Sequence, residues 1–384
     1  MPKITNNVIR LIIVVVLFKL LYIVVGIVFD KVLPSSIKTV DDKTPISVFQ
    51  RNDSDWYRRI AENSYPVIHS KAELGKCNNF DNNKQSVWAF FPAYPMLLRG
   101  TAIITRLPFD VVAFFWSLVL SFLASWGFFM FVKDFMGDKK FAFFATILLL
   151  LWPFHFYFSM YYTEAIFLAA SMWGFWSVRN KNWIVCSLSI IVLTLVRPNG
   201  LLVAFAMYVY YLEQTGIISR KGIRLKYINR AIVMKSLLFL IGPIVLALFC
   251  LYQYKMTGYW NAYMYAQEGW CRTFTFPFAV LFTQHEYSLY FNSLYALAAI
   301  SFSIFLIGKF PLSMNLIIWI GLLLPLTYGS TISVPRFISV IFPLWIYAAY
   351  FLKTFPYRKL LWIALFGGHL VIFLFWYIAN PLSY

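Results

Sequence analysis

Residues 51–65, RNDSDWYRRIAENSY, follow the first hydrophobic run and form one of the few long polar intervals of the chain. Two carboxylates, Asp53 and Asp55, stand near its start. An amphipathic helix is predicted here, with Asp53 or Ser54 as its N-cap, because apolar and polar side chains occupy opposite helical faces (Trp56, Tyr57, Ile60 and Ala61 against Arg58, Arg59 and Glu62). Such a helix is expected to lie along a membrane surface and to hold Asp53 at the water–lipid boundary. An ordinary capped loop helix would show the same pattern.

The composition around this stretch indicates a membrane protein. Of the 384 residues, 61% are hydrophobic and only 12% are charged, and the mean hydropathy is +0.70. The net charge of +18 could indicate a nucleic-acid partner, but the lysines and arginines lie in short interruptions between apolar runs, as membrane topology requires. We therefore expect a single integral membrane domain over 1–384 and no nucleic-acid partner. The first apolar run should remain as a span and not be cleaved.

An all-α polytopic fold with about eleven transmembrane helices is predicted from the apolar runs. The predicted spans are 11–29, 111–132, 141–158, 163–178, 184–196, 200–212, 236–254, 288–308, 312–328, 337–352 and 359–378. The region 30–110 would be the first external loop. Within it, the apolar stretch 88–106 is interpreted as a second interfacial or re-entrant helix, because counting it as a span would invert every later loop. Prolines 92 and 95 suit the start of that helix.

The distribution of basic residues predicts the orientation. One set of loops, together with the N-terminus, holds more than half of the 33 lysines and arginines, and six of these lie in the loop 213–235. This set is predicted to be cytoplasmic, which places the N-terminus inside and the C-terminus outside. The unusual polar motifs then all face outward (Asp53 and Asp55, 90–95, 161–164, 197–200, 268–272 and 335–337), which suggests a site on the external face.

Two of these motifs carry a charge at or near membrane depth. Glu164 stands where one predicted span begins, so it needs a partner or a water-lined cavity, although a first-turn glutamate is also favoured by the helix dipole. The turn of Arg197 to Gly200 separates two spans of 13 residues each, too short to cross the hydrocarbon core. The turn should therefore be recessed, with Arg197 at the floor of a cavity, or else it is a plain Pro-Asn-Gly turn with Arg197 as an ordinary anchor at the interface.

Each of the remaining candidate residues is weaker evidence for a site when taken alone. Arg272 and Arg336 are external arginines whose forked donors match phosphate, and Trp270 is either a substrate contact or part of an aromatic belt. The four cysteines and four histidines show no metal-binding spacing, and no metal ligand is assigned. Two of the cysteines lie in predicted external loops and could pair. No phosphate loop, dinucleotide fingerprint or serine elbow is present.

Taken in order, these motifs resemble the PIG-V family (GPI mannosyltransferase II) and its bacterial relatives within the GT-C superfamily of glycosyltransferases. The matching residues are Arg51 to Tyr57 with Ile60, Ala61 and Tyr65, then Ala89 to Pro95, Tyr162 to Phe167, Arg197 to Gly200, and Pro335 to Phe337 with Phe342 and Pro343. The chain departs from the family at Asn52, where the family has tryptophan, at Asp55, and in a polar insertion over 66–87. The resemblance implies a catalytic base in the first external loop, which would be Asp53.

The sequence is therefore interpreted as an inverting membrane glycosyltransferase. It would move a hexose, mannose by the resemblance, from a polyprenyl- or dolichyl-phosphate carrier to a lipid-linked or cell-surface acceptor outside a bacterial cell membrane (the endoplasmic reticulum membrane in a eukaryote). Asp53 and Glu164 are the predicted catalytic residues, and the substrate or phosphate contacts are Arg51, Asp55, Tyr94, Arg197, Asn199, Trp270, Arg272 and Arg336. A divalent cation is a possible cofactor. A flippase of the same lipid or a non-catalytic subunit are the alternatives.

Overall fold

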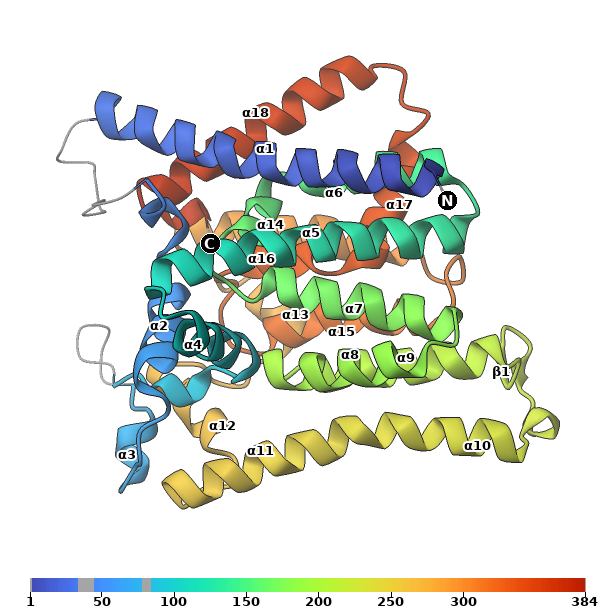
Figure 1. The fold of residues 1–384 in the computed structure, drawn as a ribbon, viewed down its shortest axis with the longest axis horizontal. Coiled ribbons are helices and arrows are strands. Elements are labelled where there is room, and N and C mark those ends of the chain that lie inside the picture. The colour runs from blue at the N-terminus through green and yellow to red at the C-terminus, as the bar shows by residue number, and fades with distance from the viewer. Residues whose placement is uncertain (1, 34–44, 78–83, 384) are drawn as a thin grey trace.

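The computed structural model describes residues 2–33, 45–77 and 84–383 and is mostly helical there. In Figure 1 the long helices run side by side, with the N-terminus and strand β1 at one end of the bundle and α2, α3 and α4 at the other. The two short strands of the described chain, β1 (Ile218–Ser219) and β2 (Gly222–Ile223), pair antiparallel inside the predicted cytoplasmic loop 213–235. The basic loop and the external loop therefore lie at opposite ends.

The predicted spans all coincide with helical segments. These are α1 (Pro2–Val32), α5 (Phe109–Met136), α6 (Lys139–Leu151) with η3 (Pro153–Ser159), α7 (Glu164–Arg179), α8 (Trp183–Val196), α9 (Gly200–Gln214), α10 (Arg230–Ser236) continued by η5 (Leu237–Leu240) and α11 (Ile241–Thr257), α14 (Tyr287–Ile304), α15 (Leu312–Leu326), α16 (Val334–Ser339), α17 (Phe342–Leu352) and α18 (Arg358–Tyr377). Among the described residues, four helices are long and apolar enough to cross a membrane, or five with the bent pair α6–η3. The count of eleven crossings stays a prediction.

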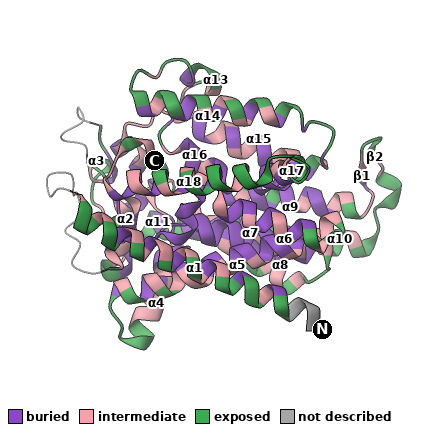
Figure 2. Cartoon of the chain, turned by 90° about the horizontal axis from the view of Figure 1, so that it is seen from above, coloured by how far each residue is buried: buried purple, intermediate pink, exposed green. Residues whose placement is uncertain are grey.

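The core lies around α7. Nearly every residue of this helix is buried, and Figure 2 shows that buried residues concentrate along α5, α6 and α7. The outer helices instead expose apolar side chains, for example Leu17 and Leu20 on α1 and Ile244 and Leu248 on α11. Exposed apolar side chains in such rows suit helices that face lipid.

Two predicted spans are broken, which corrects the prediction of continuous helices over 141–158 and 337–352. The first bends by 89° between α6 and η3, and the second is interrupted between α16 and α17. A proline follows each break (Pro153 and Pro343) at the first or second position of the next helix. Proline lacks an N–H group and clashes with the preceding turn, so it ends a helix and starts a new one.

Side chains from other helices bond the carbonyl groups at the end of η3, the second half of this broken span. Lys19 of α1 bonds the carbonyl oxygen of Ser159, and its ammonium also lies 2.6 Å from Ser117 Oγ and 4.0 Å from the centre of the Phe49 ring. Ser121 of α5 bonds the carbonyl oxygen of Phe158. Irregular backbone at membrane depth is tolerated only where the protein itself supplies such partners.

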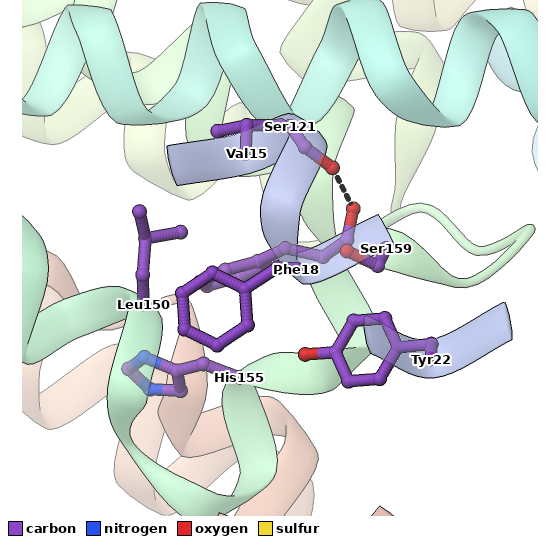
Figure 3. A pocket seen from close by; sticks show the side chains of 8 residues that line it. Val15, Phe18, Tyr22, Ser121, Leu150, His155 and Ser159 are labelled. Carbon is purple, nitrogen blue, oxygen red and sulfur yellow. Dashed lines mark hydrogen bonds between the residues drawn. The ribbon is translucent and has the colours of Figure 1, made fainter. Parts of the chain in front are cut away.

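Two histidines complete this arrangement. His155 Nδ1 contacts the carbonyl oxygen of Leu149, and His369 Nδ1 lies 3.0 Å from that of Trp152, while His369 Nε2 lies 2.5 Å from the Tyr22 hydroxyl. Figure 3 shows the small pocket beside the break. It is lined by Val15, Phe18, Tyr22, Ser121, Leu150, His155, Phe158 and Ser159. We call Lys19, Ser117, Ser121, His155 and His369 the break support.

The external loop contains the two helices predicted for it, α2 (Asp53–Asn63) and α4 (Ala93–Thr105). The predicted faces of α2 are confirmed, since Tyr57 and Ile60 are buried and Glu62 is exposed. The predicted N-cap is wrong. The helix begins at Asp53, and the capping position is Asn52, whose φ of 49° puts it outside the helical region. The short segments η1 (Ser47–Phe49), α3 (Lys71–Leu74) and η2 (Val87–Ala89) complete the loop.

A disulfide joins the first external loop to the segment after α11. The sequence left open whether the two cysteines of the predicted external loops pair, and the structure joins them as Cys77–Cys271. Nearby, Lys71 forms an ion pair with Glu268 at 3.5 Å. The segment after α11 folds into α12 (Ala262–Ala266), η6 (Gln267–Trp270) and α13 (Pro277–Val280), and the chain ends in η7 (Pro381–Ser383). The two external segments therefore form one structural unit.

Candidate functional site

Four charged side chains from distant parts of the sequence meet beside the start of α2. Arg336 Nη1 of α16 lies 2.7 Å from Asp53 Oδ2 of α2, and Arg336 Nε lies 3.4 Å from Glu164 Oε1 of α7. Arg197, in the turn between α8 and α9, bonds the same Glu164 oxygen. We call these four residues the charge cluster. Its two carboxylates and two guanidinium groups balance in charge.

Glu164 is the buried centre of the charge cluster. Its side chain is 0% exposed, and its position at the first residue of α7 places the carboxylate at the positive end of the helix dipole. Both arginines approach Oε1, whereas Oε2 has no hydrogen-bond partner among the described residues. Glu164 therefore aligns the two arginines, and one buried acceptor remains available to a hydroxyl group or a water molecule.

Asp53 is the part of the charge cluster that solvent reaches. Its side chain is 29% exposed, against 8% for Arg336 and 13% for Arg197. The backbone at Asp53 is fixed by Tyr162, whose hydroxyl accepts the Asp53 N–H at 3.2 Å and donates to the Arg51 carbonyl at 3.0 Å. Asp53 is thus held at the edge of a buried cluster, with one side open.

Aromatic and hydroxyl groups orient the two arginines. The Arg336 guanidinium lies 5.1 Å from the centre of the Tyr162 ring and 4.9 Å from that of Phe337, within cation–π range. Arg197 Nε donates to Thr163 Oγ1 at 2.9 Å, and Thr163 also contacts the Tyr57 hydroxyl at 3.3 Å. Thr163 therefore links the Arg197 turn to α2.

Gly200 allows the Arg197 turn to fold against α8. A Cβ atom at this position would lie 1.7 Å from the carbonyl oxygen of Leu193, so no larger residue fits without a backbone shift. The prediction of a turn between two short helices matches the structure, in which α8 has 14 residues and α9 has 15. Asn199 occupies the N-cap position of α9 and is partly exposed, with no side-chain cap hydrogen bond.

Three other candidates lie outside the contacts of the charge cluster. Arg51 is buried, bonds the carbonyl oxygen of Tyr377 and lies 5.8 Å from the centre of that ring, so it ties the external loop to the end of α18. Asp55 is exposed and accepts a hydrogen bond from Gln50 Nε2 at 2.8 Å. Tyr94 is fully buried with its ring edge-on to Tyr57 at 5.3 Å, and burial raises the pKa of its phenol.

The remaining two candidates belong to an aromatic group beside α2. Trp270 contacts Trp56 and Phe90 edge-to-face, at 5.5 and 5.6 Å between ring centres, and we call these three residues the aromatic ledge. Arg272 bonds the Gln267 side chain and lies 5.1 Å from the centre of the Tyr328 ring. Burial lowers the pKa of Arg272, and the negative charge of Asp53 opposes this effect. The charge of Asp53 therefore acts on Arg272, although Arg272 is not one of the four residues of the charge cluster.

Sequence reasoning did not assign Tyr162 and Thr163 to the site, although both belong to the motif that contains Glu164. Their adjacency to Glu164, just before a predicted helix, was the available signal. Lys19 was also missed, and a lone lysine inside an apolar run was the signal there. Within the described ranges, no group of three or more histidine, cysteine, aspartate or glutamate side chains could hold a metal ion.

Comparison with known proteins shows only a weak structural similarity. No family model matches the sequence, and no curated protein matches it. Two solved structures of the oligosaccharyltransferase AglB from Archaeoglobus fulgidus resemble the fold, one in complex with an inhibitory peptide and a dolichol-phosphate and one with zinc and sulfate. Their TM-scores are 0.44 and 0.41, their identities 11% and 12%, and they cover 96% and 95% of this chain. The chain spans only 56% and 53% of those proteins, so their activity is not transferred to it.

Proposed function

We propose that this protein is an inverting membrane glycosyltransferase. It moves a hexose, mannose by the resemblance, from a polyprenyl- or dolichyl-phosphate carrier to the hydroxyl group of a lipid-linked or cell-surface acceptor. The observation that carries the proposal is the charge cluster, in which a carboxylate open to solvent pairs with the buried Arg336, and the partly buried Arg197 bonds the same glutamate as Arg336. This combination supplies a base for a hydroxyl group and cations for a phosphate.

The proposed reaction is a single displacement. Asp53 takes the proton of the acceptor hydroxyl as its oxygen bonds to the anomeric carbon of the hexose, and the bond from that carbon to the phosphate oxygen breaks. The phosphate leaves on the lipid with an additional negative charge, which Arg197 and Arg336 stabilise. Glu164 holds the two arginines in place, and the unpartnered Oε2 atom is available to orient a hydroxyl group. The aromatic ledge offers its rings to the apolar face of a sugar.

The disulfide supports the external location of this site. Disulfides persist in oxidising compartments, and Cys77–Cys271 joins the loop that carries Asp53 to the segment that carries Trp270 and Arg272. The basic loop lies at the other end of the bundle in Figure 1. The proposal therefore keeps the charge cluster outside and the loop 213–235 inside.

Cysteine labelling tests this orientation. In a chain with Cys186 and Cys250 replaced, Ser330→Cys should react with a membrane-impermeant maleimide in intact cells. Lys221→Cys should react only after the cells are opened. Labelling of Lys221→Cys from outside would invert the orientation and remove the external site.

The catalytic role of Asp53 is tested by replacing it with asparagine. Asp53→Asn keeps the size of the side chain but removes the base, so hexose transfer in membranes supplied with polyprenyl-phosphate sugar should fall about 10²–10⁴-fold at equal protein level. The matched variant is Asp55→Asn, which removes one charge two residues away and should lose far less. Normal turnover of Asp53→Asn with an inactive Glu164→Gln would reassign the base. Lipid movement without sugar transfer by the wild type would favour a flippase.

A further inference from the structure

The two arginines of the charge cluster are already occupied by carboxylates. Arg336 contacts Asp53 at 2.7 Å and Glu164 at 3.4 Å, and Arg197 bonds Glu164. An arriving phosphate group therefore meets no unpaired cation among these four residues. A phosphate can take the place at Arg336 Nη1 only if Asp53 gives it up.

The exposure of the two carboxylates indicates which one yields. Glu164 is 0% exposed, accepts a hydrogen bond from Arg197, forms an ion pair with Arg336 and stands at the start of α7, so three favourable interactions hold it. Asp53 is 29% exposed and has one arginine partner. Charge pairs are weaker where solvent reaches them. The Asp53–Arg336 contact is therefore the replaceable one.

We propose, building on the proposed function, that Asp53 is an internal competitor for the phosphate site and that the lipid phosphate releases it from Arg336. In the absence of donor, Asp53 neutralises Arg336 and is itself unavailable as a base. Binding of the phosphate to Arg336 frees the carboxylate, and the new negative charge beside it favours proton uptake. The catalytic base becomes available only after the donor is bound, which makes donor binding the first step.

The proposal predicts an unusual effect on binding. If Asp53 competes with phosphate, then removing its charge should strengthen the binding of a prenyl phosphate. We expect purified Asp53→Asn in detergent micelles to bind farnesyl phosphate about tenfold more tightly than the wild type, because the carboxylate no longer competes with the phosphate for Arg336. Glu62→Gln is the matched control, because it also removes one carboxylate from α2 but one that pairs with the exposed Arg58 at 2.9 Å. Its affinity should equal that of the wild type.

Each outcome is decisive. The competition is supported if Asp53→Asn, and not Glu62→Gln, binds farnesyl phosphate more tightly than the wild type. This holds even where the wild type itself shows no measurable binding. Equal affinity in all three proteins, or weaker binding by Asp53→Asn, overturns the competition but leaves the phosphate site of the proposed function intact. If none of the proteins binds farnesyl phosphate, both proposals fail. Asp53→Ser serves as a second charge-removing variant if Asp53→Asn does not elute as a single species.

Two further probes locate the source of the effect. Farnesol has the same lipid chain without the phosphate, so its affinity should not differ between the wild type and Asp53→Asn. Inorganic phosphate should compete with farnesyl phosphate more effectively in Asp53→Asn than in the wild type. A gain in farnesol affinity in the variant would mean that the substitution opens the lipid path, and this result would overturn the competition with phosphate.

Discussion

Two of the places where the described chain buries charge compensate it differently. In the charge cluster two arginines face two carboxylates, with Arg336 Nη1 at 2.7 Å from Asp53. In the break support, Lys19 is 2% exposed and contacts Ser117, the carbonyl oxygen of Ser159 and the Phe49 ring. No carboxylate of the described chain forms an ion pair with Lys19.

The difference separates a reactive site from a structural one. Ion pairs can exchange partners with an incoming ion, and one member of the charge cluster, Asp53, is open to solvent. The hydrogen bonds of Lys19 include one to the backbone carbonyl at the end of η3, and no arriving group is needed to complete them. We therefore expect changes in the charge cluster to affect transfer and changes in the break support to affect stability.

The largest effect on stability is expected for Glu164→Gln. It removes the carboxylate shared by Arg197 and Arg336 and leaves the buried Arg336 and the partly buried Arg197 with one acid between them, which should lower the free energy of unfolding by about 3–5 kcal/mol. Denaturant unfolding in micelles measures this. The control is Glu268→Gln, whose ion pair with Lys71 is about half exposed and should contribute no more than about 1 kcal/mol. Equal stability of the two variants would mean that Glu164 is not needed to hold the arginines.

The next largest effect is expected on the rate of hexose transfer, in variants of Arg197. Arg197→Ala should lower turnover about 10²–10³-fold, as for the loss of one donor to a developing negative charge. Arg197→Lys should lie between Ala and the wild type, because an ammonium lacks the fork that bonds both Thr163 and Glu164. Arg220→Ala in the basic loop controls for loss of a positive charge. Normal transfer by Arg197→Ala would leave Arg197 as an anchor only.

A smaller effect is expected for Lys19. Lys19→Met removes the donor to the Ser159 carbonyl and should lower the free energy of unfolding by about 1–3 kcal/mol, while turnover per folded molecule stays close to the wild type. Lys31→Met, on the exposed end of α1, is the control and should change little. Unchanged stability with lost transfer would place Lys19 in the reactive site and remove the distinction between the two regions.

Local patterns account for the part of the fold that the sequence predicted correctly. Every predicted span coincides with helical segments, and the apolar stripe of α2 faces inward, because hydrophobic periodicity is a property of neighbouring residues. The wrong N-cap and the two broken spans also concern neighbouring residues, but the local sequence did not decide them. Pro153 and Pro343 were visible in the sequence, but a proline can kink, end or start a helix, and the packing of neighbouring helices decides among these.

The sequence by itself determined the residue types of the site, and the tertiary structure decided their pairing. Asp53, Glu164, Arg197 and Arg336 were candidates because charged groups at the ends of apolar runs need partners. That Arg336 pairs with Asp53 across 283 residues, and that both arginines share one oxygen of Glu164, depends on how α2, α7 and α16 approach one another. Hydrophobic periodicity is repeated along the chain and can be recognised locally, whereas an ion pair depends on the positions of individual atoms that only the packed helices define.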